Sequence, residues 1–156
     1  MAMILSRYEF YHCSALRDVA DFTRDAEFDE SDVAFAPGDA VLSITIYQYL
    51  YQLSRYRKEN VLLWHRAIPC CRCSLTFRSV VAYTVQRDAQ LTIARHSLGS
   101  IEYYCSDRKS ILLVTHEGTT LDLTVEDFVG DLEVTDEEDV GRLRSGLTIF
   151  SGRRCH

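Results

Sequence analysis

Short apolar segments separated by polar turns follow one another over residues 75–134. They read S-L-T-F-R, V-A-Y-T-V, L-T-I-A-R, I-E-Y-Y-C, I-L-L-V-T and T-L-D-L-T-V-E-D-F. Segments of this length, rich in β-branched and aromatic residues, are typical of strands in an antiparallel meander. We therefore expect an α+β fold that is mainly antiparallel β, with a twisted sheet or partial barrel. Turns are predicted at Gly99, at residues 107–110 and at Glu117-Gly118.

One helix is expected before the meander, over about residues 15–26. Ser14 is a residue type that caps helices, because its hydroxyl can accept a hydrogen bond from a free backbone N–H of the first turn. Several apolar residues recur at helical spacing on one side of this segment, namely Leu16, Val19, Ala20, Phe22 and Ala26. This N-terminal helix is therefore predicted to pack on the sheet.

A hairpin is expected around Pro37-Gly38-Asp39, because proline presets its φ angle and glycine accepts a positive φ. The strand after this turn alternates in polarity. One side carries Leu42, Ile44, Ile46 and Leu50, and the other carries Ser43, Thr45, Tyr47, Tyr49 and Tyr51. The apolar spacing over residues 46–56 also fits a helix, but a strand continues the alternation that begins at Leu42.

The remaining segments complete a single globular domain over residues 1–156, a length that buries roughly 70% of the surface of the unfolded chain. Strands are predicted over residues 3–12, 61–66 and 147–150, with Pro69 ending the second of them. Residues 152–156 are predicted to fray as a terminal tail.

The net charge is −6, and much of the acidic excess lies in two regions. One holds Asp18, Asp21, Asp25, Glu27, Asp29, Glu30, Asp32 and Asp39; the other holds Glu126, Asp127, Asp131, Glu133, Asp136, Glu137, Glu138 and Asp139. Such a surface repels phosphate backbones, so we expect no nucleic-acid partner. No secretory signal pattern and no apolar stretch near 18 residues is present, which predicts a cytoplasmic protein without a membrane partner.

Cys70-Cys71-Arg72-Cys73 contains a C-x-x-C pair, a spacing that suits half of a zinc site or a redox pair. No second C-x-x-C pair follows, and the pair leads into a strand and not into a helix. On a strand, Cys71 and Cys73 share one face, where a buried cysteine acts as a small apolar residue. We therefore expect no cofactor, and we keep Cys70 and Cys73 as metal ligands only as an alternative.

Four tyrosines, Tyr47, Tyr49, Tyr51 and Tyr56, are candidates for a stacking platform. On a strand, the first three share one face at intervals of about 6.8 Å, which is two residues of strand rise. Such a row can bind a ligand or a protein, and it can equally pack in the core or in a dimer interface. The carboxylate pairs, such as Asp29 with Asp32 and Asp122 with Glu126, are interpreted as solvent-facing residues of turns and strands.

Three segments resemble an uncharacterised family of small bacterial domains of unknown function. The matching pieces are Asp32-Val33-Ala34-Phe35, Leu75-Thr76-Phe77-Arg78-Ser79-Val80, and Gly118 through Leu121-Asp122-Leu123-Thr124-Val125-Glu126 to Leu132. The resemblance covers about residues 14–134 and implies a strand-rich domain. The strand of that family with a tryptophan beside an acidic residue is not matched after Ile46, where the tyrosines stand. The resemblance implies no activity.

Three functions fit these observations. The first is a non-enzymatic binding module that uses a sheet face or edge to contact a protein partner or a second copy of itself. The second is a small acidic inhibitor of the immunity type that masks a basic partner. The third is a metal- or thiol-dependent enzyme that uses Cys70 and Cys73.

Overall fold

The computed structural model describes residues 7–49, 55–58, 64–87, 95–144 and 150–152, and the side chains of 7–48, 70–87 and 95–135. Its elements are β1 (Arg7–Phe10), η1 (Cys13–Ala15), α1 (Leu16–Thr23), β2 (Glu27–Asp29), η2 (Glu30–Asp32), β3 (Val33–Ala36), β4 (Val41–Tyr49), β5 (Arg55–Lys58), β6 (Trp64–Gln86), β7 (Arg95–Cys105), β8 (Lys109–Thr115), β9 (Thr120–Arg144) and β10 (Phe150–Gly152). Strands dominate this order, with one short α-helix near the N-terminus.

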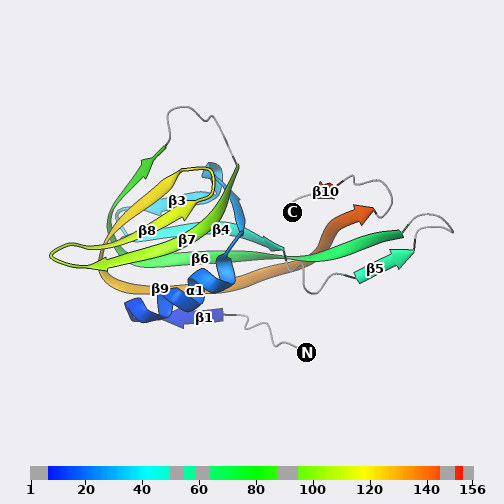
Figure 1. Ribbon diagram of the computed structural model, residues 1–156. Coiled ribbons are helices and arrows are strands. Elements are labelled where there is room, and N and C mark those ends of the chain that lie inside the picture. The colour runs from blue at the N-terminus through cyan, green and yellow to red at the C-terminus, as the bar shows by residue number, and fades with distance from the viewer. Residues whose placement is uncertain (1–6, 50–54, 59–63, 88–94, 145–149, 153–156) are drawn as a thin grey trace.

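The strands form one twisted sheet that curls round on itself (Figure 1). Hydrogen-bonded neighbours follow the order β1-β9-β8-β7-β2-β4-β6-β5, and β6 pairs in addition with β9. That pairing joins β9, β8, β7, β2, β4 and β6 into a ring of strands. The pairings are antiparallel. The predicted α+β class, mainly antiparallel, is confirmed in its twisted-sheet form.

The longest strands, β6 and β9, contain 23 and 25 residues and extend beyond the ring, where they pair with β5 and β10 (Figure 1). The prediction that Pro69 ends a strand is wrong, because β6 passes through it with a shift of register between Ile68 and Pro69. Proline is tolerated in strands at such irregularities. The two predicted strands on either side of Ser79 are likewise one strand, which a bulge bends at the positive φ (59°) of this residue.

The core lies inside the curled sheet and follows the predicted alternation. In β4, Leu42, Ile44 and Ile46 are buried while the residues between them are partly exposed. The strand reading of this segment is therefore confirmed up to Tyr49. The largest fully buried side chains are Phe10, Phe28, Phe77, Leu16, Leu42, Ile44, Ile46, Leu75, Ile111, Leu113 and Leu123.

The helix α1 is shorter than predicted and packs against β7. Leu16, Val19 and Thr23 recur at helical spacing and form its buried face. Ser14 is not its N-cap, because η1 precedes the helix and the N-cap position falls on Ala15. The helix ends at Thr23, because the backbone is extended at Arg24 and takes a positive φ (64°) at Asp25. Gln48 of β4 donates two side-chain hydrogen bonds to this end, to the carbonyl oxygens of Phe22 and Arg24, at 2.9 and 3.0 Å. Within the described residues, no helix is both long enough and apolar enough to span a lipid bilayer.

Two turns differ in detail from the prediction. The hairpin between β3 and β4 forms as expected, but its left-handed residue is Ala40 (φ 52°) and not Gly38. The turn predicted at Gly99 is wrong, because Gly99 lies inside β7 at a register shift. A Cβ there would lie 3.2 Å from both the ring of His116 and the carbonyl oxygen of Val114, which explains the small residue.

The predictions for the chain ends are only partly covered by the structure. β1 forms within residues 3–12, β6 begins within residues 61–66, and Gly152 pairs in β10. Residues 3–6, 61–63, 147–149 and 153–156 lie outside the described residues. The proposed frayed tail therefore stays a prediction for all but its first residue.

Candidate functional site

The predicted row of four tyrosines is described only at its first side chain. Tyr47 is half-buried on β4, opposite Glu27 of β2 and Arg72 of β6. The backbones of Tyr49 and Tyr56 lie in β4 and β5, but their side chains lie outside the description, as does Tyr51 entirely. Use of this row as a binding surface stays a prediction.

The predicted metal ligands, Cys70 and Cys73, lie on β6 with their side chains on opposite faces. The register of β6 against β4 is regular from Cys70 to Cys73, so positions three apart point in opposite directions. Cys73 belongs to the core together with Cys71, whereas Cys70 takes part in a disulfide. No cluster of three or more potential metal ligands occurs among the described residues.

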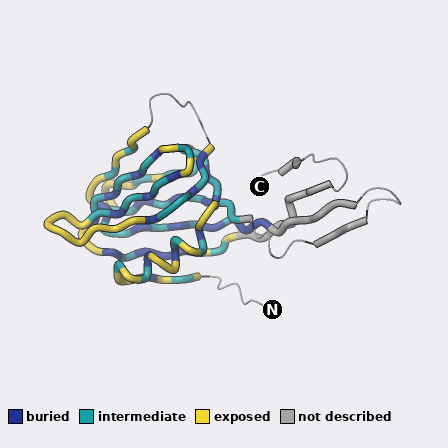
Figure 2. Tube along the Cα trace, in the orientation of Figure 1, coloured by how far each residue is buried: buried dark blue, intermediate teal, exposed yellow. Residues whose placement is uncertain are grey.

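Exposed tyrosines occur instead on the hairpin that joins β7 to β8. Residues 102–109 form a projection, here called the tyrosine hairpin, in which every residue is exposed (Figure 2). Tyr103 is 40% exposed and Tyr104 is 50% exposed. Because neighbouring strand residues face opposite sides, each face of the projection carries one aromatic ring. Tyr103 also packs edge-on against Phe128 of β9, with ring centroids 5.9 Å apart.

Two exposed tyrosines are held by a carboxylate two residues earlier in the chain. The hydroxyl of Tyr104 donates a hydrogen bond to Glu102 (3.1 Å), and the hydroxyl of Tyr11 donates one to Glu9 (2.7 Å). Positions two apart in extended chain share a face, which makes this contact possible. The hydrogen bond and the negative charge of the carboxylate raise the pKa of both phenols. Each tyrosine therefore stays neutral and presents an oriented ring to solvent.

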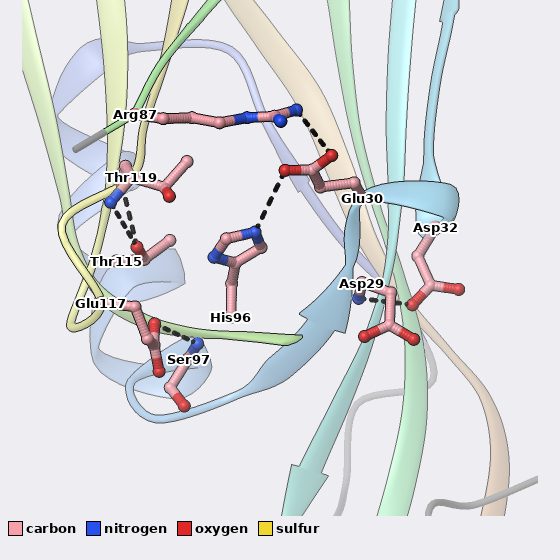
Figure 3. A network of polar contacts seen from close by, with 9 residues as sticks. All are labelled: Asp29, Glu30, Asp32, Arg87, His96, Ser97, Thr115, Glu117 and Thr119. Atoms are coloured by element: carbon pink, nitrogen blue, oxygen red, sulfur yellow. Dashed lines mark hydrogen bonds and ion pairs between the residues drawn. The ribbon is translucent and has the colours of Figure 1, made fainter. Parts of the chain in front are cut away.

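A second polar group surrounds His96 of β7 (Figure 3). Its imidazole is only 2% exposed and stacks at a tilt on Phe28, with centroids 5.5 Å apart. One carboxylate oxygen of Glu30, in η2, lies 3.5 Å from Nε2 of the imidazole. Its other carboxylate oxygen lies 2.6 Å from the guanidinium group of Arg87, at the end of β6. Neither ring nitrogen of His96 makes a hydrogen bond. The carboxylate therefore ties η2 to β7 and to the end of β6.

The neighbouring polar residues in Figure 3 satisfy the backbone of turns. Thr115 and Thr119 hydrogen-bond each other across the β8–β9 turn, and Glu117 accepts a hydrogen bond from the backbone N–H of Ser97 at 2.8 Å. The predicted carboxylate pair Asp29 and Asp32 forms a capping box on η2, in which Asp32 accepts the N–H of Asp29 at 2.8 Å. These contacts agree with the interpretation of this acidic pair as part of a turn.

Sequence reasoning missed the tyrosine hairpin, although a signal for it is present. The chain contains Glu-x-Tyr twice, at Glu9 to Tyr11 and at Glu102 to Tyr104. Both copies lie in or directly after strands, where this spacing brings the carboxylate beside the phenol. Two adjacent aromatic residues before a polar turn further indicate that at least one ring faces outward.

Comparison with known proteins finds no matching protein-family model, no matching curated protein and no matching solved structure.

Proposed function

We propose that this protein is a non-enzymatic binding module that contacts a protein partner, or a second copy of itself, through the tyrosine hairpin. The observation that supports this most is the exposure of Tyr103 and Tyr104 on a projection without buried residues. Tyrosine contributes a large apolar area and a polar tip, and it is enriched in interfaces and in their hot spots.

The hydrogen bond from Tyr104 to Glu102 supports the same proposal, because it fixes a ring that is otherwise free to rotate. A side chain that is ordered before binding loses less conformational entropy in the complex.

The acidic-inhibitor alternative receives less support, because much of the first acidic region is already engaged within the chain. Asp18 and Asp25 accept hydrogen bonds from Tyr8 and His116. The ion pairs are Asp21 with Arg24, Glu27 with Arg95, and Glu30 with Arg87. Paired carboxylates present a weaker field to a basic partner. The enzyme alternative is weakened by the divergent side chains of Cys70 and Cys73.

Site-specific photocrosslinking tests this proposal in the cells that make the protein. p-Benzoylphenylalanine replaces Tyr104 in one variant and Val81 in a control variant. Val81 is a matched position, because it is a 58% exposed hydrophobic residue of β6, away from the tyrosine hairpin. We expect a covalent adduct from position 104 and none from position 81.

The mass of the adduct identifies the kind of partner. An adduct of twice the chain mass indicates self-association, and any other discrete mass indicates a different protein. Substituting Tyr103→Ser in the crosslinking variant should reduce the yield at least about tenfold if it removes a hot-spot side chain, since hot spots contribute 2 kcal/mol or more. Equal adducts from positions 81 and 104, or none from either, would overturn the proposal.

A further inference from the structure

The first Glu-x-Tyr pair of the chain, Glu9 with Tyr11, already binds an arginine. The hydroxyl of Tyr11 donates a hydrogen bond to one carboxylate oxygen of Glu9 at 2.7 Å, and the guanidinium of Arg7 lies 3.2 Å from the other oxygen. Arg7 and Glu9 lie two residues apart in β1, and Tyr11 follows two residues later, so the three side chains share one face. The carboxylate thus binds a phenol with one oxygen and a guanidinium with the other.

The second pair, Glu102 with Tyr104 in the tyrosine hairpin, has the same phenol contact but no cation. Tyr104 donates a hydrogen bond to one carboxylate oxygen of Glu102 at 3.1 Å, and within the described part of the chain Glu102 has no ion pair. Position 100, which corresponds to Arg7, is a serine. The two segments read R-Y-E-F-Y and S-I-E-Y-Y, so the cation is the only member of this face that differs.

The basic residues of the same hairpin are engaged elsewhere. Nζ of Lys109 lies 3.2 Å from a carboxylate oxygen of Asp127, and Arg108 donates a hydrogen bond to the hydroxyl of Thr124. Asp127 and Thr124 both belong to β9. Lys109 and Arg108 therefore reach toward β9, and the exposed carboxylate of Glu102 faces solvent.

We propose that the second pair, Glu102 with Tyr104, binds an arginine side chain of a protein partner, as the first pair binds Arg7. The partner is the one proposed above for the tyrosine hairpin, so this inference rests on that function. A guanidinium is planar and carries N–H groups in a fixed fork, so it can donate to a carboxylate and stack on an aromatic ring. Glu102 offers its second carboxylate oxygen, and Tyr104, which is 50% exposed, offers the ring.

Charge and order favour this occupant. The charge of Glu102 is not compensated by a described cation, and charge complementarity selects a basic partner. An ammonium is a compact, strongly hydrated point charge without a planar face, which favours arginine over lysine. The hydrogen bond from Tyr104 keeps the ring beside the carboxylate, so both groups are in place before the arginine binds.

Titration with two small peptides tests the second pair without the partner. Acetyl-Gly-Arg-Gly-amide or its lysine analogue is added to protein with 13C-labelled tyrosine, and the ring signals of Tyr104 are followed by NMR. Below saturation, we expect the arginine peptide to shift these signals at least about threefold more than the lysine peptide at equal concentration. Equal shifts from both peptides, or no shift from either, would overturn the proposal.

Two substitutions that change the net charge equally separate the pair from the overall charge. Glu102→Gln should reduce the response of Tyr104 to the arginine peptide at least about threefold, because it removes the acceptor of the guanidinium. Glu9→Gln should leave this response unchanged, because the carboxylate of Glu9 is already occupied by Arg7. Equal reductions in both variants would count against a specific site.

The first pair provides a gain-of-function control. Arg7→Ser gives it the sequence pattern of the second pair, while Arg78 keeps its ion pair with Asp131. The ring signals of Tyr11 should then respond to the arginine peptide, which they should not do in the native protein. A Tyr11 that stays silent in Arg7→Ser would mean that the contact with Arg7 is no guide to the second pair.

The photocrosslinking variant at position 104 separates this inference from the function on which it rests. Adding Glu102→Gln to that variant should lower the yield of the adduct. An adduct whose yield does not change would overturn arginine recognition and leave docking through the tyrosine hairpin in place. Peptide binding without any adduct would overturn docking to a protein and leave the cation site in place.

Discussion

The Nε2 atom of His96 lies 3.5 Å from a carboxylate oxygen of Glu30, and this is the sole polar contact of a side chain that is 98% buried within the described structure. Both ring nitrogens lack a hydrogen bond. A buried polar atom without a hydrogen bond costs about 1–3 kcal/mol relative to a satisfied one. The imidazole therefore contributes through its packing on Phe28 and its 3.5 Å contact with Glu30, and not through hydrogen bonds.

Replacing this imidazole by an apolar side chain of similar size tests that account. In His96→Leu, two unsatisfied polar atoms disappear and most of the contact with Phe28 is kept. We expect a free energy of unfolding within about 1 kcal/mol of the wild type, or above it, by urea denaturation at pH 8. A loss of more than about 2 kcal/mol would show that the imidazole is hydrogen-bonded in solution, for example to an ordered water.

The carboxylate of Glu30 also affects the pKa of Tyr83. Because Arg87 shifts this pKa in the opposite direction, substitutions of Glu30 and Arg87 should have opposite effects. Burial raises the pKa of Tyr83 above the ordinary value of 10.0, Glu30 raises it further, and Arg87 lowers it. Glu30→Gln should therefore lower the pKa of Tyr83, and Arg87→Gln should raise it, in an NMR titration of 13C-labelled tyrosine. If both substitutions move the pKa in the same direction, the two side chains do not face the phenol as described.

The raised pKa of Tyr83 also makes the free energy of unfolding depend on pH. The folded state holds the phenolic proton of Tyr83 to a higher pH than the unfolded chain does, so this contribution is fully present below pH 10. It is lost as the pH rises from the unfolded pKa through the raised folded pKa. Tyr83→Phe should remove this part of the alkaline fall in stability.

The strands could be predicted from the sequence where one face is buried, because strand side chains alternate with a period of two. The alternation at Leu42, Ile44 and Ile46 is an example. The end of α1 could not be predicted in this way, since the side chain that caps it, Gln48, comes from another element. The passage of β6 through Pro69 depends in the same way on a register shift against β9.

In the candidate sites, too, only contacts between residues close in the sequence could be predicted. The Glu102 to Tyr104 contact is local and its spacing is visible in the sequence. The contact between Glu30 and His96 is not, because it exists only after η2 and β7 have been brought together. The burial of His96 likewise depends on the pairing of β2 with β7.

A nearly buried ion pair gives a third prediction. Asp131 of β9, whose side chain is 5% exposed, pairs with Arg78 of β6, and Arg7 lies 3.8 Å away. Arg78→Met leaves a desolvated carboxylate with only the more distant cation, so we expect a loss of about 2 kcal/mol in the free energy of unfolding.

Two variants control this measurement. Adding Asp131→Leu to Arg78→Met removes the stranded charge and should recover most of the loss. Arg24→Met breaks the exposed pair with Asp21 and should change the stability by less than about 1 kcal/mol. Equal losses for Arg24→Met and Arg78→Met would contradict a special role of Asp131.

The close approach of β1 to β9 at Gly130 gives the last prediction. Gly130 lies opposite Phe10 of β1 and Phe77 of β6. A Cβ at this position would overlap the carbonyl oxygen of Thr76 and lie 2.5 Å from Cζ of Phe10. Gly130→Ala should therefore lower the free energy of unfolding by about 3 kcal/mol, because the backbone oxygen cannot rotate away.

Gly38→Ala, with nothing within 4 Å of its Cβ, is the control and should change the free energy of unfolding by less than about 0.5 kcal/mol. Removing the Phe10 ring should not rescue Gly130→Ala, since the contact with the Thr76 oxygen remains. A Gly130→Ala protein as stable as Gly38→Ala would mean that the three strands are not packed this closely.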